Sequence, residues 1–157
     1  MLRSICVTAA GAAVLLTGGG SAWAAAPSPA PSVSACSGVI EVDGFAFTPA
    51  AVLPGGDSSA VLAVTNCTAQ AQTVSEQWTG RFSSLTGTGI PAGCPVIDPL
   101  PRSQALPAHT EETTATTYTV PAGCTADRLT VTVQLSQDGT PLATASAVLT
   151  INRSTTG

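Results

Sequence analysis

The chain of 157 residues contains no lysine, and only 9% of its residues are charged. Five arginines stand against nine acidic residues, which gives a net charge of −4. A mildly acidic chain without lysine lacks the basic surface that binds nucleic acid or an anionic membrane. We therefore expect neither kind of partner.

The sequence is equally poor in residues that carry catalytic and metal chemistry. It has a single histidine, His109, and no pair of cysteines separated by two residues. Glu111 and Glu112 follow this histidine, but so few candidate ligands fall short of a metal site. No Gly-x-Ser-x-Gly motif marks a nucleophile, and the acidic residues are scattered. We expect no enzymatic activity, no metal and no cofactor.

Beyond its N-terminal region, the chain has no apolar run long enough to span a membrane. The N-terminal region has the parts of a secretory signal peptide: an arginine, an apolar stretch from Ile5 to Leu16, and small residues that suit signal peptidase. We predict a signal peptide at residues 1–26, a flexible Pro/Ser/Ala-rich N-terminus at 27–35, and secretion.

One alternative concerns the N-terminus of the exported chain. The sequence Val-Ser-Ala-Cys at residues 33–36 is similar to a lipobox, which would place a lipid anchor on Cys36. A lipobox normally adjoins the apolar region, whereas a Pro/Ser/Ala segment intervenes here. Secretion without a lipid is therefore favoured, and the lipid anchor stays open.

Removal of the signal peptide leaves an even number of cysteines: Cys36, Cys67, Cys94 and Cys124. In an exported domain, such a set favours two disulfides. Metal binding is the weaker interpretation because histidine is so scarce. A catalytic cysteine is weaker still, since it would leave an odd cysteine unpaired.

Apolar residues alternate with polar ones through most of the remaining chain, which is the period of a half-buried β-strand. The alternation is cleanest from Leu129 to Leu135, and Asp138-Gly139 then marks a hairpin turn. A shift of phase at Gly44 indicates a β-bulge. Counting the strands gives about seven, which predicts a Greek-key β-sandwich over residues 36–152 and a disordered C-terminus at 153–157.

Two stretches resemble bacterial immunoglobulin-like domains of secreted and surface proteins. They are "FTPAAVLPGGDSSAVLAVTN" near the start of the domain and "TYTVPAGCTADRLTVTVQLSQDGTPLATASAVLTI" at its end. The resemblance implies a seven-stranded immunoglobulin-like sandwich. Such domains commonly serve as spacers, adhesion modules or accessory binding domains.

The stretch "VDGFAFTPAAVLPGGDSSAVLAVTN" is also similar to the first half of a cupredoxin. That family places a histidine soon after the asparagine, where this chain has glutamines and Thr73. Its late cysteine is followed by a histidine and a methionine, whereas Cys124 is followed by "TADRL". A type 1 copper centre needs two imidazoles and a thiolate. His109 alone cannot complete it, so electron transfer is excluded.

The tetrapeptide Pro-Ala-Gly-Cys occurs twice, ending at Cys94 and at Cys124. In each copy the proline ends a segment, the glycine allows a turn, and the cysteine fixes that turn. Strand directions in a seven-stranded sandwich bring these two cysteines to one pole and Cys36 and Cys67 to the other. We therefore favour the pairs Cys36–Cys67 and Cys94–Cys124, although the sequence alone permits other connectivities.

Trp78 is predicted to be the core tryptophan of the third strand, as in immunoglobulin-type sandwiches. Glu76 falls on the same apolar face, where a carboxylate is rarely found. We favour a bulge that turns Glu76 outward. If the side chain is buried, it needs a partner, and Arg81 and Arg102 are candidates.

The segment from Ser83 to His109 shows little strand pattern and is rich in proline. Long loops often carry binding surfaces, and stiff ones lose less entropy on binding. Its apolar residues are the candidate partner surface: Ile90, Val96, Ile97 and Leu100. The alternative is that these residues merely cap the end of the sandwich.

We expect a secreted, non-catalytic binding or surface-associated structural module. Its partner would be an unknown extracellular protein or a component of the cell envelope. A secreted protease inhibitor is the alternative, because a proline-rich loop next to a disulfide is a plausible inhibitory loop. The Cys-Thr-Arg-Glu-Tyr and Val-Asp-Gly-Val-Trp motifs of bacterial subtilisin inhibitors are absent.

Overall fold

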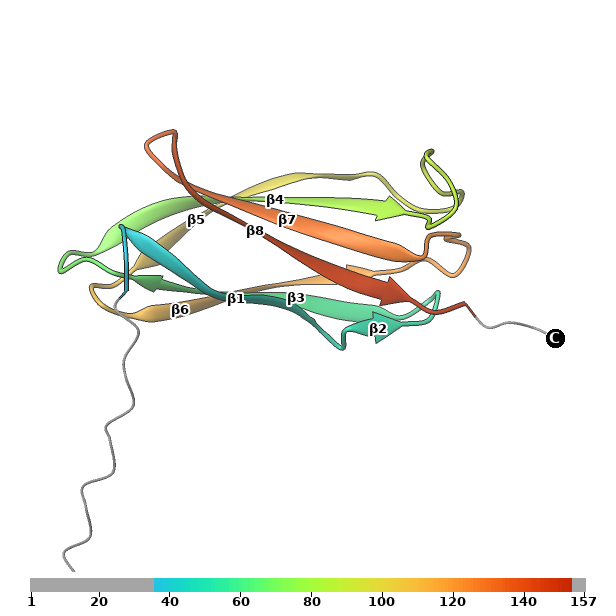
Figure 1. The fold of residues 1–157 in the computed structure, drawn as a ribbon, viewed down its shortest axis with the longest axis horizontal. Helices are drawn as coiled ribbons and strands as arrows, with labels where there is room; N and C mark the ends of the chain where they lie inside the picture. The colour runs from blue at the N-terminus through green and yellow to red at the C-terminus, as the bar shows by residue number, and fades with distance from the viewer. Residues whose placement is uncertain (1–35, 154–157) are drawn as a thin grey trace, which may run out of the picture. The chain divides into compact units, whose positions relative to one another are not determined.

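The computed structural model describes residues 36–153 (Figure 1). The predicted signal peptide, the predicted flexible segment at 27–35 and residues 154–157 lie outside this range. The described part of the chain is all-β and contains no helix, so none is long and apolar enough to cross a membrane. Its strands are β1 (Ile40–Thr48), β2 (Ala51–Val52), β3 (Asp57–Asn66), β4 (Gln72–Ser83), β5 (Ile97–Leu106), β6 (Glu111–Thr119), β7 (Arg128–Gln137) and β8 (Thr140–Ile151).

The strands form two sheets that lie one over the other as two layers (Figure 1). One sheet has the order β1-β3-β6, and the other has the order β2-β8-β7-β4-β5. All neighbouring strands are antiparallel except the short pair of β2 and β8. Apolar side chains fill the space between the layers, and Phe45 of β1 meets Trp78 of β4 edge to face at 5.4 Å.

The sequence predicts about seven strands, and the structure has eight. One addition is β2, which is too short to show a period. The stretch from Ser83 to His109, which showed little strand pattern, contains the whole of β5. The alternation is hidden because two of the partly buried positions of β5 are polar, Arg102 and Gln104. Pro99 and Pro101 also interrupt the strand pattern. Prolines are tolerated there because β5 is an edge strand.

Other local predictions are confirmed. The register of β1 against β3 shifts between Val42 and Gly44, so the predicted bulge is present. Asp138 and Gly139 both have positive φ, 48° and 80°, as the tight turn between β7 and β8 requires. The alternating residues of β7 face the core, where Leu129, Val131, Val133 and Leu135 are fully buried.

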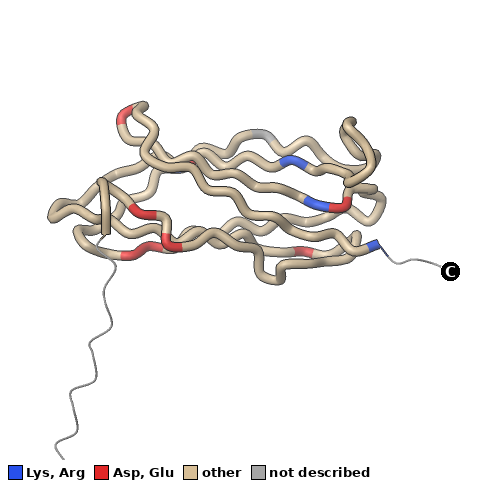
Figure 2. Tube along the Cα trace, in the orientation of Figure 1, with Lys and Arg blue, Asp and Glu red and all other residues tan. Residues whose placement is uncertain are grey.

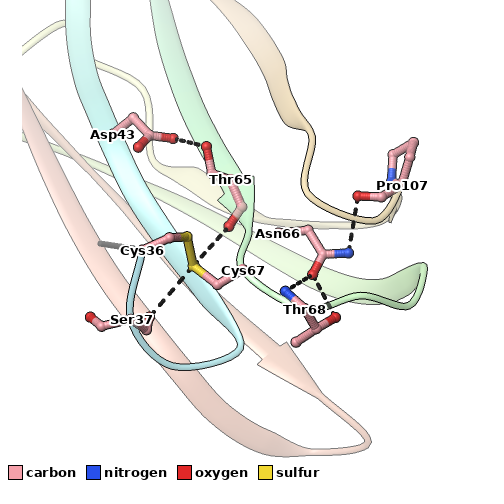
Figure 3. The surroundings of a disulfide bond; sticks show 8 residues. All are labelled: Cys36, Ser37, Asp43, Thr65, Asn66, Cys67, Thr68 and Pro107. Carbon is pink, nitrogen blue, oxygen red and sulfur yellow. Dashed lines mark hydrogen bonds between the residues drawn. A yellow bond between two sulfur atoms is a disulfide. The ribbon is translucent and has the colours of Figure 1, made fainter. Parts of the chain in front are cut away.

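The two disulfides are the pairs that the sequence favoured, and they lie at opposite poles. Cys36 and Cys67 join the start of the described chain to the end of β3, with a Cα–Cα distance of 5.4 Å (Figure 3). Cys94 and Cys124 join the segments before β5 and before β7, with a Cα–Cα distance of 4.4 Å.

Asn66, next to the first disulfide, is fully buried and fully hydrogen-bonded (Figure 3). Its amide nitrogen donates to the carbonyls of Leu106, Pro107 and Gln70 at 3.0, 3.0 and 2.8 Å. Its side-chain oxygen accepts the backbone N–H of Thr68 at 2.9 Å. One side chain thus ties the end of β3 to the end of β5, which belongs to the other sheet.

The two Pro-Ala-Gly-Cys copies pack against each other at the other pole. The carbonyl of Ala92 accepts the backbone N–H of Thr125 at 2.9 Å. Gly93 has a φ of +70°, and a Cβ placed on it would lie 2.1 Å from the carbonyl oxygen of Gly123. The first glycine is therefore required both for its backbone conformation and for its close approach to the second copy.

Candidate functional site

The connection between β4 and β5, residues 84–96, is hereafter the apolar loop. Several interactions fix it to the body of the domain. Besides the Cys94–Cys124 disulfide and the Ala92–Thr125 hydrogen bond, Ser84 Oγ donates to the carbonyl of Thr125 at 3.4 Å. The backbone N–H of Leu85 donates to Asp127 Oδ2 at 2.7 Å. The other oxygen of Asp127 forms an ion pair with Arg153 at 2.8 Å.

Despite these attachments, the loop presents large apolar side chains to solvent. Leu85, Ile90 and Val96 are 71%, 75% and 74% exposed. Leu100, at the start of the adjoining strand, is 47% exposed. Exposed apolar patches on a protein surface commonly mark a site of interaction.

The predicted partner surface therefore divides into two parts. Ile90 and Val96 are exposed on the loop, and Leu100 lies half-exposed on β5. Ile97 is half-buried and packs against Gly80, where an added Cβ would lie 2.7 Å from its Cδ1. Ile97 thus helps to hold β5 in place and is the least accessible of the predicted residues.

A cavity of about 290 Å³ lies between the apolar loop and the end of β4. It is lined by residues 80–83 of β4 and by residues 87–90, 95 and 96 of the loop. Ile90 and Val96 therefore belong to both the exposed surface and the cavity, and Phe82 and Arg81 contribute from the strand. The volume lies at the small end of the range for sites that bind small ligands.

Charges are distributed unevenly over the domain. In Figure 2 the visible arginines lie toward the end at which β8 finishes, while most acidic residues lie toward the other end. Arg81 on β4 pairs in register with Thr130, and Ser83 pairs with Arg128 on β7. Both arginines are exposed on the outer face of the sheet, diagonal to each other beside the apolar loop. Diagonal neighbours in a sheet lie about 7–8 Å apart.

A second polar arrangement lies inside the sandwich. The favoured outward bulge at Glu76 is wrong, because this side chain is fully buried. Its Oε2 accepts Trp78 Nε1–H at 2.9 Å and its Oε1 accepts Thr114 Oγ–H at 3.1 Å, so the carboxylate is satisfied without an ion pair. A register shift between β4 and β5 does occur, but farther along, between Trp78 and Gly80, and its extra residue is in β5.

Arg102 on β5 pairs in register with Glu76, and its side chain reaches the other sheet. Its Cζ lies 5.3 Å from the centre of the Trp78 ring, and its Nη1 donates to the carbonyl of Ala115 on β6 at 3.2 Å. The sequence suggested this arginine, with Arg81, as a candidate partner of a buried Glu76. It instead packs on the tryptophan that Glu76 hydrogen-bonds.

Two hydroxyls on the inner face of β6 are buried and have no hydrogen-bond partner within the described residues: Thr116 Oγ1 and Tyr118 Oη. Burial raises the pKa of the Tyr118 phenol, and the positive charge of Arg102 partly opposes this effect. Nothing in the sequence distinguishes these hydroxyls from that of Thr114, which does have a partner.

The described residues assemble no catalytic constellation that we can identify. His109 is exposed in the turn between β5 and β6, at the pole opposite the apolar loop. Cys36, Cys67 and Glu41 place their ligand atoms within 4.8 Å of one another. The two sulfurs are bonded to each other, so this cluster leaves only one carboxylate as an ordinary metal ligand.

No protein-family model and no curated protein sequence matches the chain. Among solved structures it is similar to the Pseudomonas fluorescens alkylpurine DNA glycosylase AlkC bound to DNA containing an abasic site analog, with a TM-score of 0.51 and 15% identity over 71% of this chain. It is also similar to the sporulation control protein Spo0M of Bacillus subtilis, with a TM-score of 0.44 and 18% identity over 74% of this chain.

These likenesses are limited to the fold. The chain spans 30% of the length of the glycosylase chain and 49% of the Spo0M chain. The first likeness, at 15% identity, shows a shared arrangement of strands and no more. The second has a TM-score of 0.44, which is too low to support an argument. The functional argument therefore depends on the geometry of this chain.

Proposed function

We propose that the chain is an exported, non-catalytic binding module, and that its partner is an extracellular protein or a component of the cell envelope. The observation that carries the proposal is the exposure of Leu85, Ile90 and Val96 on a loop fixed by a disulfide. An interface core requires apolar side chains, and a loop that is already ordered loses little entropy when it binds.

Export is part of the proposal, and the two disulfides support it. Disulfides persist in oxidising compartments and are rare in the cytosol. The immunoglobulin-like assignment is also part of the proposal. It is supported by the two stacked sheets and by Trp78, which is buried in the third long strand.

The surface can be tested with charge substitutions that leave the core intact. The double variant Ile90→Asp/Val96→Asp places two carboxylates on the proposed surface. Ala46→Asp is the control, because Ala46 is exposed on β1, which belongs to the other sheet. Binding of the purified domain to isolated cell envelopes and to exported proteins of the producing cell would be measured as an isotherm.

We expect the double variant to bind at least about tenfold more weakly, because removal of central apolar contacts typically costs this much. Ala46→Asp should bind as the wild type does, and both variants should unfold at nearly the wild-type temperature. Equal binding by wild type and double variant would show that the surface is wrong. A panel of serine proteases run beside the isotherm tests the inhibitor alternative, and inhibition would replace the binding-module proposal.

A further inference from the structure

The last residues of β4 have a hydrogen-bonded neighbour on one side only. Pairing of β4 with β7 continues to Ser83, opposite Arg128. Pairing with β5 ends earlier, at Gly80 opposite Ile97. Residues 81–83 therefore form an open strand edge, and this edge lines the cavity beneath the apolar loop.

The apolar loop does not replace the missing strand. Among the backbone hydrogen bonds of the described turns and loops, none joins residues 81–83 to residues 84–96. The bond that reaches this part of β4 comes from the β7 side, where Asp127 N–H donates to the carbonyl of Ser83 at 3.0 Å. Main-chain groups of successive strand residues point alternately to the two sides, so the N–H and C=O of Phe82 are the groups that face the cavity on the loop side.

The early end of the β5 pairing has a local cause. Trp78 pairs with Leu100, and Gly80 pairs with Ile97. One residue of β4 therefore lies opposite two residues of β5, so β5 contains a bulge. Pro99 lies in this bulge and has no N–H to donate. The Ile97 side chain then packs onto Gly80, which has no side chain to oppose it.

Another exposed edge of the sandwich is treated differently. β6 is an edge strand, and Arg102 Nη1 donates to its carbonyl at Ala115. An arginine laid across an edge is one of the devices that prevent further strands from adding. At the end of β4, the open edge faces the cavity instead of a charged side chain laid across it.

We infer that the open edge of β4 accepts an extended peptide from the partner, which adds as a short strand beneath the apolar loop. This inference rests on the proposed function, since it specifies how the same surface binds. Strand addition obtains affinity from main-chain hydrogen bonds and selectivity from alternate side chains. About three residues of an extended strand cover the edge, a length of about 10 Å.

The surroundings of the edge define the chemistry of that peptide. Side chains of an added strand alternate between the two faces of the sheet. Arg81 and Arg128 lie on the outer face, so side chains directed there should be acidic. Phe82 and the apolar side chains of Ile90 and Val96 line the cavity, so side chains directed inward should be apolar. The expected occupant alternates acidic and apolar residues.

The test uses a capped pentapeptide, acetyl-Glu-Val-Glu-Val-Glu-amide, titrated into isotope-labelled protein containing both disulfides. Two analogues carry N-methyl groups, one on its valine amides and the other on its glutamate amides. A third peptide has lysine in place of glutamate. Backbone amide chemical shifts of Arg81, Phe82, Ser83, Ile90 and Val96 are followed up to about 5 mM peptide, a range that detects weak binding.

We expect the parent peptide to shift these amides, and one N-methylated analogue to bind at least about tenfold more weakly while the other binds normally. This asymmetry arises because alternate residues of a strand direct their N–H groups to the edge. The lysine peptide should also bind more weakly because it opposes the arginines. Each of these results supports strand addition.

Other outcomes overturn it in distinguishable ways. If both methylated analogues bind like the parent and still shift Ile90 and Val96, strand addition is wrong while the apolar surface stands. If no peptide shifts Arg81 to Ser83, the edge is not a peptide site, whatever the envelope-binding experiment shows. If the protein instead self-associates through the same amides, the occupant is a second copy of the chain.

Discussion

The buried hydroxyl of Tyr118 provides the sharpest test of the packing inside the sandwich. The side chain is 7% exposed, its ring meets Phe47 edge to face at 5.9 Å, and its hydroxyl has no partner among the described residues. Burying a hydroxyl without a hydrogen bond costs about 1–3 kcal/mol. Tyr118→Phe removes the hydroxyl and keeps the ring. We expect the variant to be more stable by about 1 kcal/mol, the low end of this range, because loss of the hydroxyl also removes some packing contacts.

The same side chain predicts a dependence of stability on pH. Burial raises the pKa of Tyr118 in the folded state above its ordinary value of 10.0. Above about pH 10 the unfolded chain therefore loses the phenolic proton while the folded chain keeps it, so the free energy of unfolding falls as pH rises. Tyr118 is the chain's only tyrosine and the chain has no lysine. All four described cysteines are in disulfides, which leaves this phenol as the main group that titrates there.

Urea unfolding followed by circular dichroism, from about pH 7 to pH 11, measures both effects. At neutral pH a gain of about 1 kcal/mol corresponds to a rise of about 3–6 °C in Tm for a domain of this size. The wild type should lose stability above about pH 10, and Tyr118→Phe should not. A variant that is less stable by more than about 1 kcal/mol would refute the reasoning, since the hydroxyl must then have a partner in solution. An unchanged alkaline loss in the variant would refute the assignment to Tyr118.

Two further predictions use pairs of matched substitutions. Thr114→Val removes the hydrogen bond to the buried Glu76 and should lower the free energy of unfolding by about 1–3 kcal/mol, whereas Thr116→Val removes an unpartnered hydroxyl and should be neutral or slightly stabilising. Equal effects of the two in urea unfolding would mean that the hydrogen bonds of β6 are misassigned. Gly93→Ala should cost more than about 3 kcal/mol because its φ is +70° and Gly123 is in contact, whereas Gly123→Ala, with no atom within 4 Å, should cost less than about 1 kcal/mol in thermal unfolding. A mild Gly93→Ala variant would show that the two Pro-Ala-Gly-Cys copies do not pack closely.

The parts of the fold that could be predicted are those governed by local chemistry. A strand with one face in the core must alternate, so β7 is evident from Leu129 to Leu135. A tight turn needs two residues that tolerate positive φ, so Asp138-Gly139 is evident as well. The disulfide pairing required one further step, the direction of the strands, and this was sufficient because adjacent antiparallel strands bring alternate loops to the same pole.

The parts that could not be predicted depend on partners distant in sequence. Glu76 is buried because Trp78 and Thr114 donate hydrogen bonds to it, and Thr114 comes from the other sheet. The candidate site could be predicted only in part. The exposure of Ile90 and Val96 follows from a proline-rich apolar segment. The open edge of β4 depends instead on the register between β4 and β5, which no local pattern encodes.

The Cys36–Cys67 disulfide has a mechanical consequence. It bonds the first described residue directly to the residue that follows β3, the middle strand of its sheet. Tension applied at Cys36 therefore bypasses β1, which would otherwise detach from β3 one residue pair at a time, beginning at Ile40. The force acts along β3, whose bonds to both neighbours are then strained together. A domain held in this way resists a pull on its N-terminal side as one unit, even though the first strand of the sheet is an edge strand.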